Sequence, residues 1–316
     1  MIVDPAGTHA ISNLRWLDHG NLWTYSLGDS ESRAVHVSDA QWLSLVSGSG
    51  EYFAAVHQRE SGTVRLTAHS YLNTAETVSS IELEIGDNKV RDATKLTVSF
   101  MGETSVWSFL PKAYIVHAFE DELLLLVDLS QRAGQTQPLH WYKGAYDTLY
   151  QGILGVAEVP GSPLVIVSIQ RDSEPVLYDP VARKVVRKLK LTGRHGGPQL
   201  FFRRTAPELW ASDYDTLLRL DLHSWNVLDV LKLQEPKGEM KRMNVGEYCF
   251  DIDEDFCVVA RPYSGDVVGI DTKTFKIALR AETGGQPQEV GALRGGFVVA
   301  RDLKTGQLLR STLKRI

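Results

Sequence analysis

The feature that most constrains the fold is a pair of similar segments near the C-terminus. Residues 256–261 (FCVVAR) and 263–268 (YSGDVV) recur as 296–301 (GFVVAR) and 304–309 (KTGQLL). Each copy reads as an apolar strand, a turn containing glycine and a second apolar strand, which is typical of a β-hairpin. The spacing of about 40 residues is that of a repeated four-stranded unit. The chain is therefore predicted to consist of repeated β units.

The rest of the sequence has the same character. Helical periodicity is almost absent, and short apolar runs are separated by connections rich in Gly, Pro, Asp and Asn. In three places an apolar strand ends in an aspartate and a polar turn leads to another apolar strand: Asp179, Asp221 and Asp271, with Asp128 as a looser fourth copy. We expect these aspartates to accept backbone N–H groups in their turns.

Glycine-rich segments at 193–198 and 284–287 are predicted to connect one unit to the next, because glycine supplies the positive φ angles of a chain reversal. The units fall at 41–95, 96–147, 148–197, 198–243 and 244–287, with shorter ends at 1–40 and 288–316. This pattern predicts an all-β fold, a single β-propeller domain over residues 1–316. We predict seven blades of four antiparallel strands, closed by adjoining ends, with six blades as the rival.

On these features the chain resembles the seven-bladed propeller superfamily that includes YVTN-repeat proteins and the heavy subunits of quinone-cofactor amine dehydrogenases. The resemblance covers 148–316 clearly and 41–147 loosely, and it rests on the Asp-ending strands and hairpins. The Gly-His and Trp-Asp pairs of WD40 repeats are missing. The resemblance implies a fold and says little about activity.

Composition excludes several classes of function. The net charge of −5 and the pI near 6.0 give no overall attraction for nucleic acid or an anionic membrane. No apolar run reaches the length of a membrane span, and the first residues do not form a secretion signal. Two cysteines fit a reducing compartment. A cytoplasmic protein without nucleic-acid or membrane partners is expected.

An acidic run with flanking cysteines lies at 249–257. Asp251, Asp253 and Asp255 could begin a calcium loop, but the Gly and Glu that the helix-loop-helix motif requires are replaced by Phe256 and Pro262. We therefore favour an acidic hairpin turn between the first two strands of a blade. A hairpin centred on Asp253 would set Cys249 opposite Cys257, either as a redox pair or, as we favour, as two small buried side chains.

No local motif for catalysis or for a cofactor is recognised. The nine histidines lack metal-site spacing, and nucleophile-elbow and phosphate-loop motifs are absent. We predict no metal and no cofactor, and the catalytic residues, if any, stay unknown. His195, between glycines at a blade junction, is the histidine most worth examining for binding.

Aromatic and basic residues offer the remaining candidates. Most of the seven tryptophans are expected to pack between blades, but the irregular stretch with Trp141, Tyr142, Tyr146 and Tyr150 is predicted to bind a partner. A basic cluster (Lys184, Arg187, Lys188, Lys190 and Arg194) fits an outer strand with one wet face, where lysine discourages pairing, better than a nucleic-acid stripe.

The function favoured by these features is a non-catalytic binding or scaffolding propeller. It would hold a protein or a small ligand on its loops and channel mouth. The alternative is an enzyme or enzyme subunit with its site in the central channel, such as an amine-dehydrogenase-heavy-subunit-like or lyase-like propeller. Whether the chain is an enzyme stays open at this point.

Overall fold

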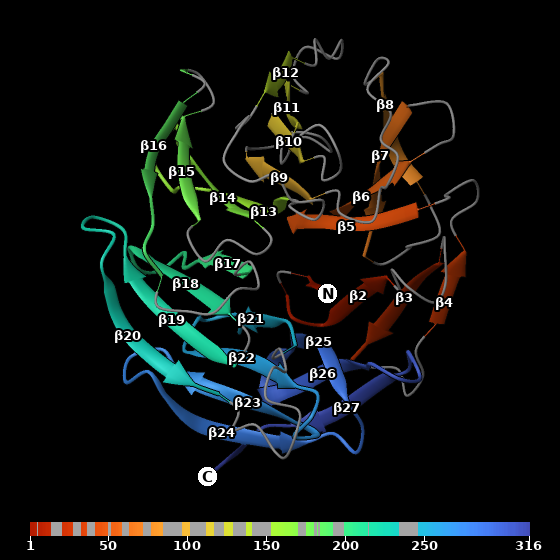
Figure 1. Cartoon of the computed structure of the whole chain (residues 1–316). Helices are drawn as coiled ribbons and strands as arrows, with labels where there is room; N and C mark the ends of the chain where they lie inside the picture. Colours follow the sequence, from red (N-terminus) through yellow and green to blue (C-terminus); the bar gives the residue numbers. More distant parts are fainter. Residues whose placement is uncertain are drawn as a thin grey trace. The chain divides into compact units, whose positions relative to one another are not determined.

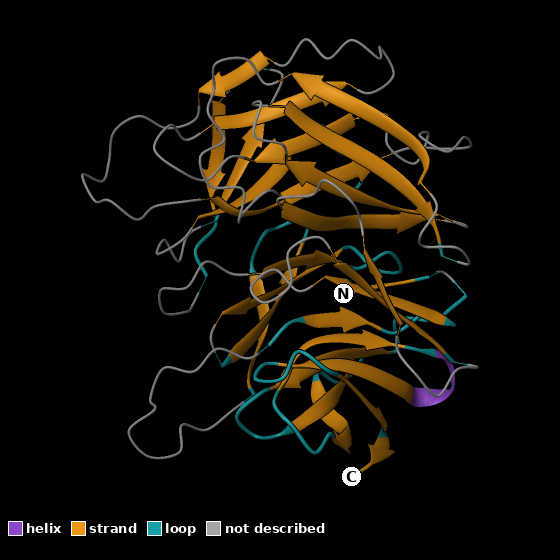
Figure 2. Ribbon diagram, turned by 90° about the vertical axis from the view of Figure 1, so that its right-hand side faces the viewer, coloured by secondary structure: helices purple, strands orange, loops and turns teal. Residues whose placement is uncertain are grey.

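The fold was analysed in a computed structural model of the whole chain. It describes residues 1–4, 6–13, 21–27, 33–36, 42–49, 52–58, 63–71, 77–84, 97–101, 112–116, 123–128, 137–140, 153–169, 175–179, 182, 184–191, 199–213, 215–233 and 246–316. Over these residues the regular structure is β-strand, apart from one 3-10 turn, η3 (Arg294–Gly296) (Figure 2). In the same part of the chain, no helix is long and apolar enough to cross a bilayer.

Contacts divide the chain into two compact units, which are described separately. Unit 1 comprises Met1–Ser12, Thr24–Arg33 and Leu191–Ile316, and unit 2 comprises Asn13–Trp23 and Ala34–Lys190. The N-terminal sheet has residues in both units, in the order β1-β2-β3-β4. Its strands are β1 (Ile2–Val3), β2 (His9–Asn13), β3 (Asn21–Ser26) and β4 (Arg33–His36).

Unit 1 contains three further antiparallel sheets (Figure 1). The first consists of β17 (Gln199–Phe202), β18 (Glu208–Asp213), β19 (Thr216–Asp221) and β20 (Val227–Lys232). The second consists of β21 (Tyr248–Phe250), β22 (Phe256–Arg261), β23 (Asp266–Asp271) and β24 (Lys276–Glu282), with β28 (Lys314–Arg315) added beside β24. The third consists of β25 (Pro287–Ala292), β26 (Phe297–Asp302) and β27 (Leu308–Thr312).

Unit 2 contains three four-stranded sheets. The first consists of β5 (Trp42–Ser49), β6 (Tyr52–Gln58), β7 (Thr63–Ser70) and β8 (Thr77–Glu84). The second consists of β9 (Thr97–Met101), β10 (Lys112–Val116), β11 (Leu123–Asp128) and β12 (Gln137–His140). The third consists of β13 (Ile153–Glu158), β14 (Val165–Ile169), β15 (Val176–Asp179) and β16 (Lys184–Lys188).

Strand order follows chain order in every described sheet, as expected for propeller blades. The two hairpins predicted from the repeat are confirmed as β22–β23 and β26–β27. The C-terminal end, predicted to be shorter than the other units, forms a sheet of three strands. The prediction that segment 1–40 falls short of a full blade is wrong, because short strands β1 and β4 complete a four-stranded sheet.

The central residues of β22 and β23 are apolar because their sheet is covered on both faces. On one face, a core shared with the β17–β20 sheet contains Trp210, Leu217, Leu233, Tyr248, Cys257, Val259, Val268, Ile270 and Phe275. Trp210 is fully buried there, which confirms for this residue the packing role predicted for most tryptophans. Burial on both faces explains why these strands lack the alternating pattern of a half-exposed sheet.

On the other face, a second core joins this sheet to the three-stranded C-terminal sheet. It contains Val258, Ala260, Val267, Ala281, Val290, Ala292, Val298 and Ala300. Small side chains dominate this core, so the two sheets approach closely. Gly246 illustrates the approach, since a Cβ at this position would lie 2.3 Å from the carbonyl oxygen of Gln288.

The N-terminal strands also pack against the C-terminal sheet within unit 1. A third core contains Ala10, Tyr25, Leu293 and Val299, with Met1, Val3, Leu27 and Leu308 packed beside it. A buried polar group reinforces the contact, because Ser12 Oγ donates to Glu289 Oε2 at 2.6 Å and Arg301 Nη1 donates to Ser12 Oγ at 3.0 Å. Residues from both ends of the chain therefore share one core.

Aspartates close the turns as predicted. Asp221 Oδ1 accepts the N–H of Ser224 at 2.7 Å, and Asp271 Oδ1 accepts the N–H of Thr274 at 2.7 Å. Asp179 Oδ1 accepts the N–H of Ala182 at 2.8 Å. The side chain of Asp128 lies outside the described residues. Each described copy thus uses its carboxylate in place of a backbone acceptor.

The same turn occurs once more, at a place the sequence did not indicate. Asp302, the last residue of β26, accepts the N–H groups of Lys304 and Thr305 at 2.9 and 2.7 Å. In this turn Gly306 has a φ of 70°, whereas the equivalent left-handed positions after Asp221 and Asp271 hold Trp225 (60°) and Phe275 (54°). An aromatic residue at positive φ stores strain, which these two turns tolerate.

The two cysteines do not face each other. Cys249 pairs with Val258, and Cys257 pairs with Phe250, so the hairpin is centred between Asp253 and Glu254 and the pairing is shifted by one residue from that expected. A shift of one residue sends a side chain to the opposite face. Cys257 lies in the core shared with β17–β20, and Cys249 packs beside the core shared with the C-terminal sheet. The register excludes a redox pair between them in this structure and leaves two small packed side chains.

Both thiols are expected to resist thiol reagents in the folded protein. Burial raises the pKa of Cys249 to about 12 and the pKa of Cys257 well above its ordinary value, so neither is a thiolate near neutral pH. Ellman's reagent near pH 8 should therefore titrate no thiol in the native protein and both after unfolding in urea. Rapid native labelling of either cysteine would contradict the described packing.

The acidic run forms the turn between β21 and β22, as favoured from the sequence. Asp251 accepts the N–H of Phe256 at 3.0 Å, while Asp253 and Asp255 are exposed. Burial, followed by the charges of Asp255 and Asp253, raises the pKa of Asp251, with a backbone hydrogen bond from Phe256 acting in the opposite direction. Over the described residues, no group of three or more His, Cys, Asp or Glu side chains could hold a metal ion.

Candidate functional site

The binding residues predicted from the sequence lie outside the described residues. These are Trp141, Tyr142, Tyr146, Tyr150 and His195. They remain predictions, and the candidate site must be built from the described turns of unit 1. The strands of the β21–β24 sheet separate two ends, each of which carries a different set of turns.

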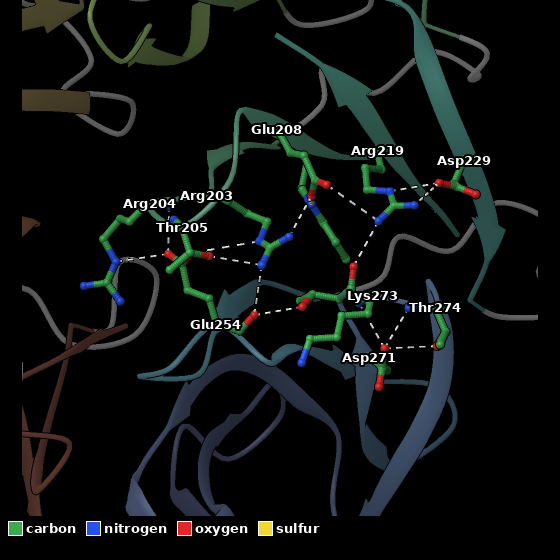
Figure 3. A network of polar contacts seen from close by, with 12 residues as sticks. Arg203, Arg204, Thr205, Glu208, Arg219, Asp229, Glu254, Asp271, Lys273 and Thr274 are labelled. Carbon is green, nitrogen blue, oxygen red and sulfur yellow. Dashed lines mark hydrogen bonds and ion pairs between the residues drawn. The ribbon is translucent and has the colours of Figure 1, made fainter.

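One end carries a polar network between the β17–β18 and β21–β22 turns (Figure 3). Its centre is Glu254, whose side chain is 2% exposed and whose φ is 55°. The Glu254 carboxylate accepts the N–H of Arg204 at 2.9 Å, the N–H of Thr205 at 2.9 Å and the hydroxyl of Thr205 at 2.7 Å. Arg204 Nε donates to the same carboxylate at 3.0 Å. Glu254 therefore clamps the turn of the neighbouring sheet.

The network continues through two further arginines. Arg203 Nη1 donates to Glu208 Oε2 at 2.9 Å, and the indole N–H of Trp210 donates to the same oxygen at 3.0 Å. Arg219 donates from Nε to Asp229 at 2.8 Å and from Nη1 to the carbonyl oxygen of Thr272 at 2.9 Å. Arg219 therefore links the first sheet to the β23–β24 turn of the second.

This network is built to hold structure rather than to react. Burial alone would raise the pKa of Glu254, but hydrogen bonds from Thr205 and Arg204 outweigh burial and lower it. Both Glu254 oxygens already accept hydrogen bonds within the chain. A carboxylate in this state is a poor general base, because its proton affinity is low and its oxygens are occupied.

The opposite end carries an exposed surface, which we call the linker face and define by Tyr263, Gly284, Leu303 and Lys304. Tyr263 lies in the β22–β23 turn and is 43% exposed, and Leu303 lies in the β26–β27 turn and is 42% exposed. Gly284, with a φ of 73°, lies in the linker between the two sheets. The linker face thus presents one aromatic and one aliphatic side chain on neighbouring turns.

Backbone contacts hold the linker between these two turns. Thr283 donates its N–H to the carbonyl oxygen of Gly265 at 3.2 Å, on the β22–β23 side. Gln286 donates its N–H to Asp302 Oδ2 at 2.7 Å and accepts the N–H of Leu303 at 2.7 Å, on the β26–β27 side. Gly285 is required here, because a Cβ would lie 2.3 Å from Asp302 Oδ2. Gly284 has the positive φ predicted for this linker, whereas Gly285 does not, and linker 193–198 lies outside the described residues.

Ion pairs between the buried Asp266 and two arginines support the linker face. Asp266, which is fully buried, accepts Arg261 Nε at 2.8 Å and Arg280 Nε at 2.6 Å. Arg261 Nη1 also donates to the carbonyl oxygen of Leu233, at the end of the preceding sheet, at 2.6 Å. These contacts fix the turn that carries Tyr263. A rigid exposed aromatic side chain loses little conformational entropy on binding.

Replacing Asp302 with alanine is expected to loosen the linker face and lower the free energy of unfolding by about 2 kcal/mol, since the N–H groups of Gln286 and Thr305 lose their acceptor. Burial would raise the pKa of Asp302, but hydrogen bonds from Gln286, Thr305 and Lys304 lower it. A lowered pKa stabilises the fold above the unfolded-state pKa of about 3.9 and loses that effect as pH falls through the folded-state value. Urea titrations at neutral and acidic pH should show the deficit shrinking in acid, and a pH-independent deficit would contradict this assignment.

The comparisons with known proteins concern the fold. No family model matches the chain, and no curated protein matches it. Among solved structures that match is the crystal structure of the beta-propeller domain of Cps50 (Swd1) from Myceliophteria thermophila. It matches with a TM-score of 0.67 and 12% sequence identity, over 99% of this chain and 95% of that chain. Together with the antiparallel sheets in chain order, this match establishes the all-β propeller fold predicted from the sequence.

Sequence reasoning missed the residues that build both ends of the described sheets. The partners of Glu254 lie 49 and 50 residues earlier in the chain, so no local motif signals them. The linker face had a weak signal, because Leu303 and Tyr263 fall in the two turns of the repeat from which the fold was predicted. An apolar side chain in a turn next to glycine could have marked them.

Proposed function

We propose that this chain is a non-catalytic propeller that binds a partner protein through the linker face. The observation that carries the proposal is the pair of exposed apolar side chains, Tyr263 and Leu303, on neighbouring turns held by buried hydrogen bonds. Exposed apolar groups on a rigid base suit binding, whereas the charged groups of the Glu254 network are already engaged inside the chain.

The proposal includes the finer features expected from the sequence. Residues 1–316 would form one propeller domain of seven blades, closed by the adjoining ends 1–40 and 288–316, and of the YVTN-like type. The shared core of Ala10, Tyr25, Leu293 and Val299 supports the adjoining ends. Trp141, Tyr142, Tyr146, Tyr150 and His195 would extend the binding surface, and the protein would work in the cytoplasm.

The test compares partner capture by three forms of the protein. The Tyr263→Ser/Leu303→Ser double variant removes the apolar groups of the linker face, and Phe297→Ser removes an equally exposed apolar group, 43%, from the other end of β26. Tagged proteins would be recovered from the native cell after crosslinking, and the captured proteins quantified by mass spectrometry. A specific partner should fall at least about tenfold with the double variant and persist with Phe297→Ser.

Two outcomes would overturn the proposal. Equal capture by the double variant and the wild type would place binding elsewhere. Turnover of a small molecule by the purified chain, unchanged in the double variant, would instead favour the alternative of an enzyme with its site in the central channel.

A further inference from the structure

The outermost strand of one sheet in unit 2 is unusually exposed. β16 is the last strand in the order β13-β14-β15-β16 (Figure 1). All of its residues, Lys184–Lys188, are exposed, including Val185 at 39% and Val186 at 50%. The sequence predicted an outer strand with one wet face over residues 184–191. The outer position is confirmed, but every residue of Lys184–Lys188 is exposed, and the buried side of the pattern begins only at Leu189 and Leu191. Valine on an exposed edge is a feature that edge strands ordinarily avoid.

The segment that contains this strand carries charge of one sign, although Asp179 of β15 lies opposite Lys184. Residues 183–194 contain six basic residues, Arg183, Lys184, Arg187, Lys188, Lys190 and Arg194, and no acidic residue. The chain as a whole carries a net charge of −5, so the basic segment departs from the average. Such a field attracts acidic chains and repels basic ones.

The chain itself demonstrates that an outer strand of this geometry accepts an added strand. β24 pairs with β28 through Leu279↔Arg315 and Arg280↔Lys314. Ile316 also donates its N–H to the carbonyl oxygen of Ala278 at 3.2 Å. Backbone groups at the outer edge of β24 are thereby used by a fifth strand.

β16 and β24 share a register irregularity that aligns them residue by residue. The pairing of β23 with β24 shifts between Gly269 and Ile270, leaving Ala278 as the extra residue. The pairing of β15 with β16 shifts between Leu177 and Tyr178, leaving Val186 as the extra residue. Val186 therefore corresponds to Ala278, and the two residues after it correspond to the pair that binds β28. The bulge does not block strand addition at this position in β24, so it need not block it in β16.

We propose that the outer edge of β16 docks an extended acidic segment of a partner protein, which pairs with it as a fifth strand. Main-chain hydrogen bonds would supply affinity, and the valines would contact alternate side chains of the added strand. The basic residues would select the partner, because they favour acidic side chains and repel basic strands such as β28 or a second copy of β16. This surface is separate from the linker face and does not depend on its proposed function.

The test measures binding of a short fluorescein-labelled peptide of alternating Glu and Val by fluorescence anisotropy. The wild-type protein should bind it, and the Lys188→Glu/Lys190→Glu variant should bind at least about tenfold more weakly. The matched control is Lys232→Glu, which reverses an exposed charge at the end of β20 and should leave binding unchanged. A peptide of the same sequence with alternate backbone nitrogens methylated keeps the charge but cannot pair, and it should lose at least about tenfold in affinity.

Each other outcome would overturn the proposal. Equal binding of the methylated peptide would mean that charge alone attracts it. Equal binding by the charge-reversed variant would place the site elsewhere. Absence of binding to the wild-type protein would mean that β16 does not dock an acidic strand. Tighter binding of a short RNA of equal length than of the peptide would identify the basic segment as a nucleic-acid site instead.

Discussion

Replacing Trp210 with alanine is expected to lower the free energy of unfolding by about 4 kcal/mol, which is the largest effect we expect from a single substitution. Trp210 is fully buried in the core between two sheets, and its ring packs edge-on against Phe250 at 5.2 Å and Phe275 at 4.9 Å between centroids. Truncation would leave a cavity and would remove the indole N–H that donates to Glu208. Urea titration followed by far-ultraviolet circular dichroism measures the loss without depending on tryptophan emission.

Trp225 provides the matched control in the same sheet. It lies half-buried in a turn with a φ of 60°, a conformation that glycine adopts without strain. Trp225→Gly is therefore expected to change the free energy of unfolding by less than about 1 kcal/mol. Equal losses for the two variants would mean that packing between the sheets is not the main source of stability.

The fold could be predicted because its signals are local. Apolar strands, Gly-containing turns and Asp-ending strands each occupy only a few neighbouring residues, and the structure places hairpins and carboxylate-closed turns where they were expected. Repetition adds to this, since one hairpin recognised twice at a spacing of about 40 residues predicts that neighbouring segments form similar units. The propeller follows from the sequence alone.

The register of the paired strands could not be predicted as well as the fold. The β21–β22 hairpin is centred between Asp253 and Glu254 rather than at Asp253, and the resulting one-residue shift in pairing moves Cys249 and Cys257 to opposite faces. The sequence around the turn is acidic on both sides of Asp253, so its composition does not distinguish the two centres. The observed centre is stabilised by the hydrogen bond from the N–H of Phe256 to Asp251, and it places Glu254 at a positive φ.

The candidate site could be predicted least, because several of its contacts join one sheet to another sheet or to the linker between sheets. Thr283 ties the linker to one sheet and Asp302 ties it to the next, and its support depends on Arg261 meeting the carbonyl oxygen of Leu233. Such pairs follow from how sheets are stacked, which a pattern within one strand does not encode. The aromatic stretch at 141–150 was predicted from composition, and it stays a prediction.

Replacing Glu254 with alanine is expected to lower the free energy of unfolding by about 3 kcal/mol. The substitution would leave the N–H groups of Arg204 and Thr205 without an acceptor and would remove the negative charge beside Arg203 (Figure 3). Glu254→Gly should lower the free energy of unfolding by less than Glu254→Ala does. Both variants lose the same hydrogen bonds, but glycine relieves the strain of a φ of 55°. Urea titrations of the two variants separate the clamp from the backbone strain.

Asp253→Ala is the control, since this exposed neighbour lies in the same turn and should change stability by less than about 0.5 kcal/mol.

The dependence of the Glu254→Ala deficit on pH tests whether the charge of Glu254 is responsible. Because the pKa of Glu254 is lowered in the fold, its contribution is complete above the unfolded-state value of about 4.3 and disappears as pH falls through the folded-state value. The alanine deficit should therefore shrink in acid. A deficit that is the same at neutral and acidic pH would mean that Glu254 acts through packing, and the link between the two sheets would then depend on Arg219 and the core beneath it.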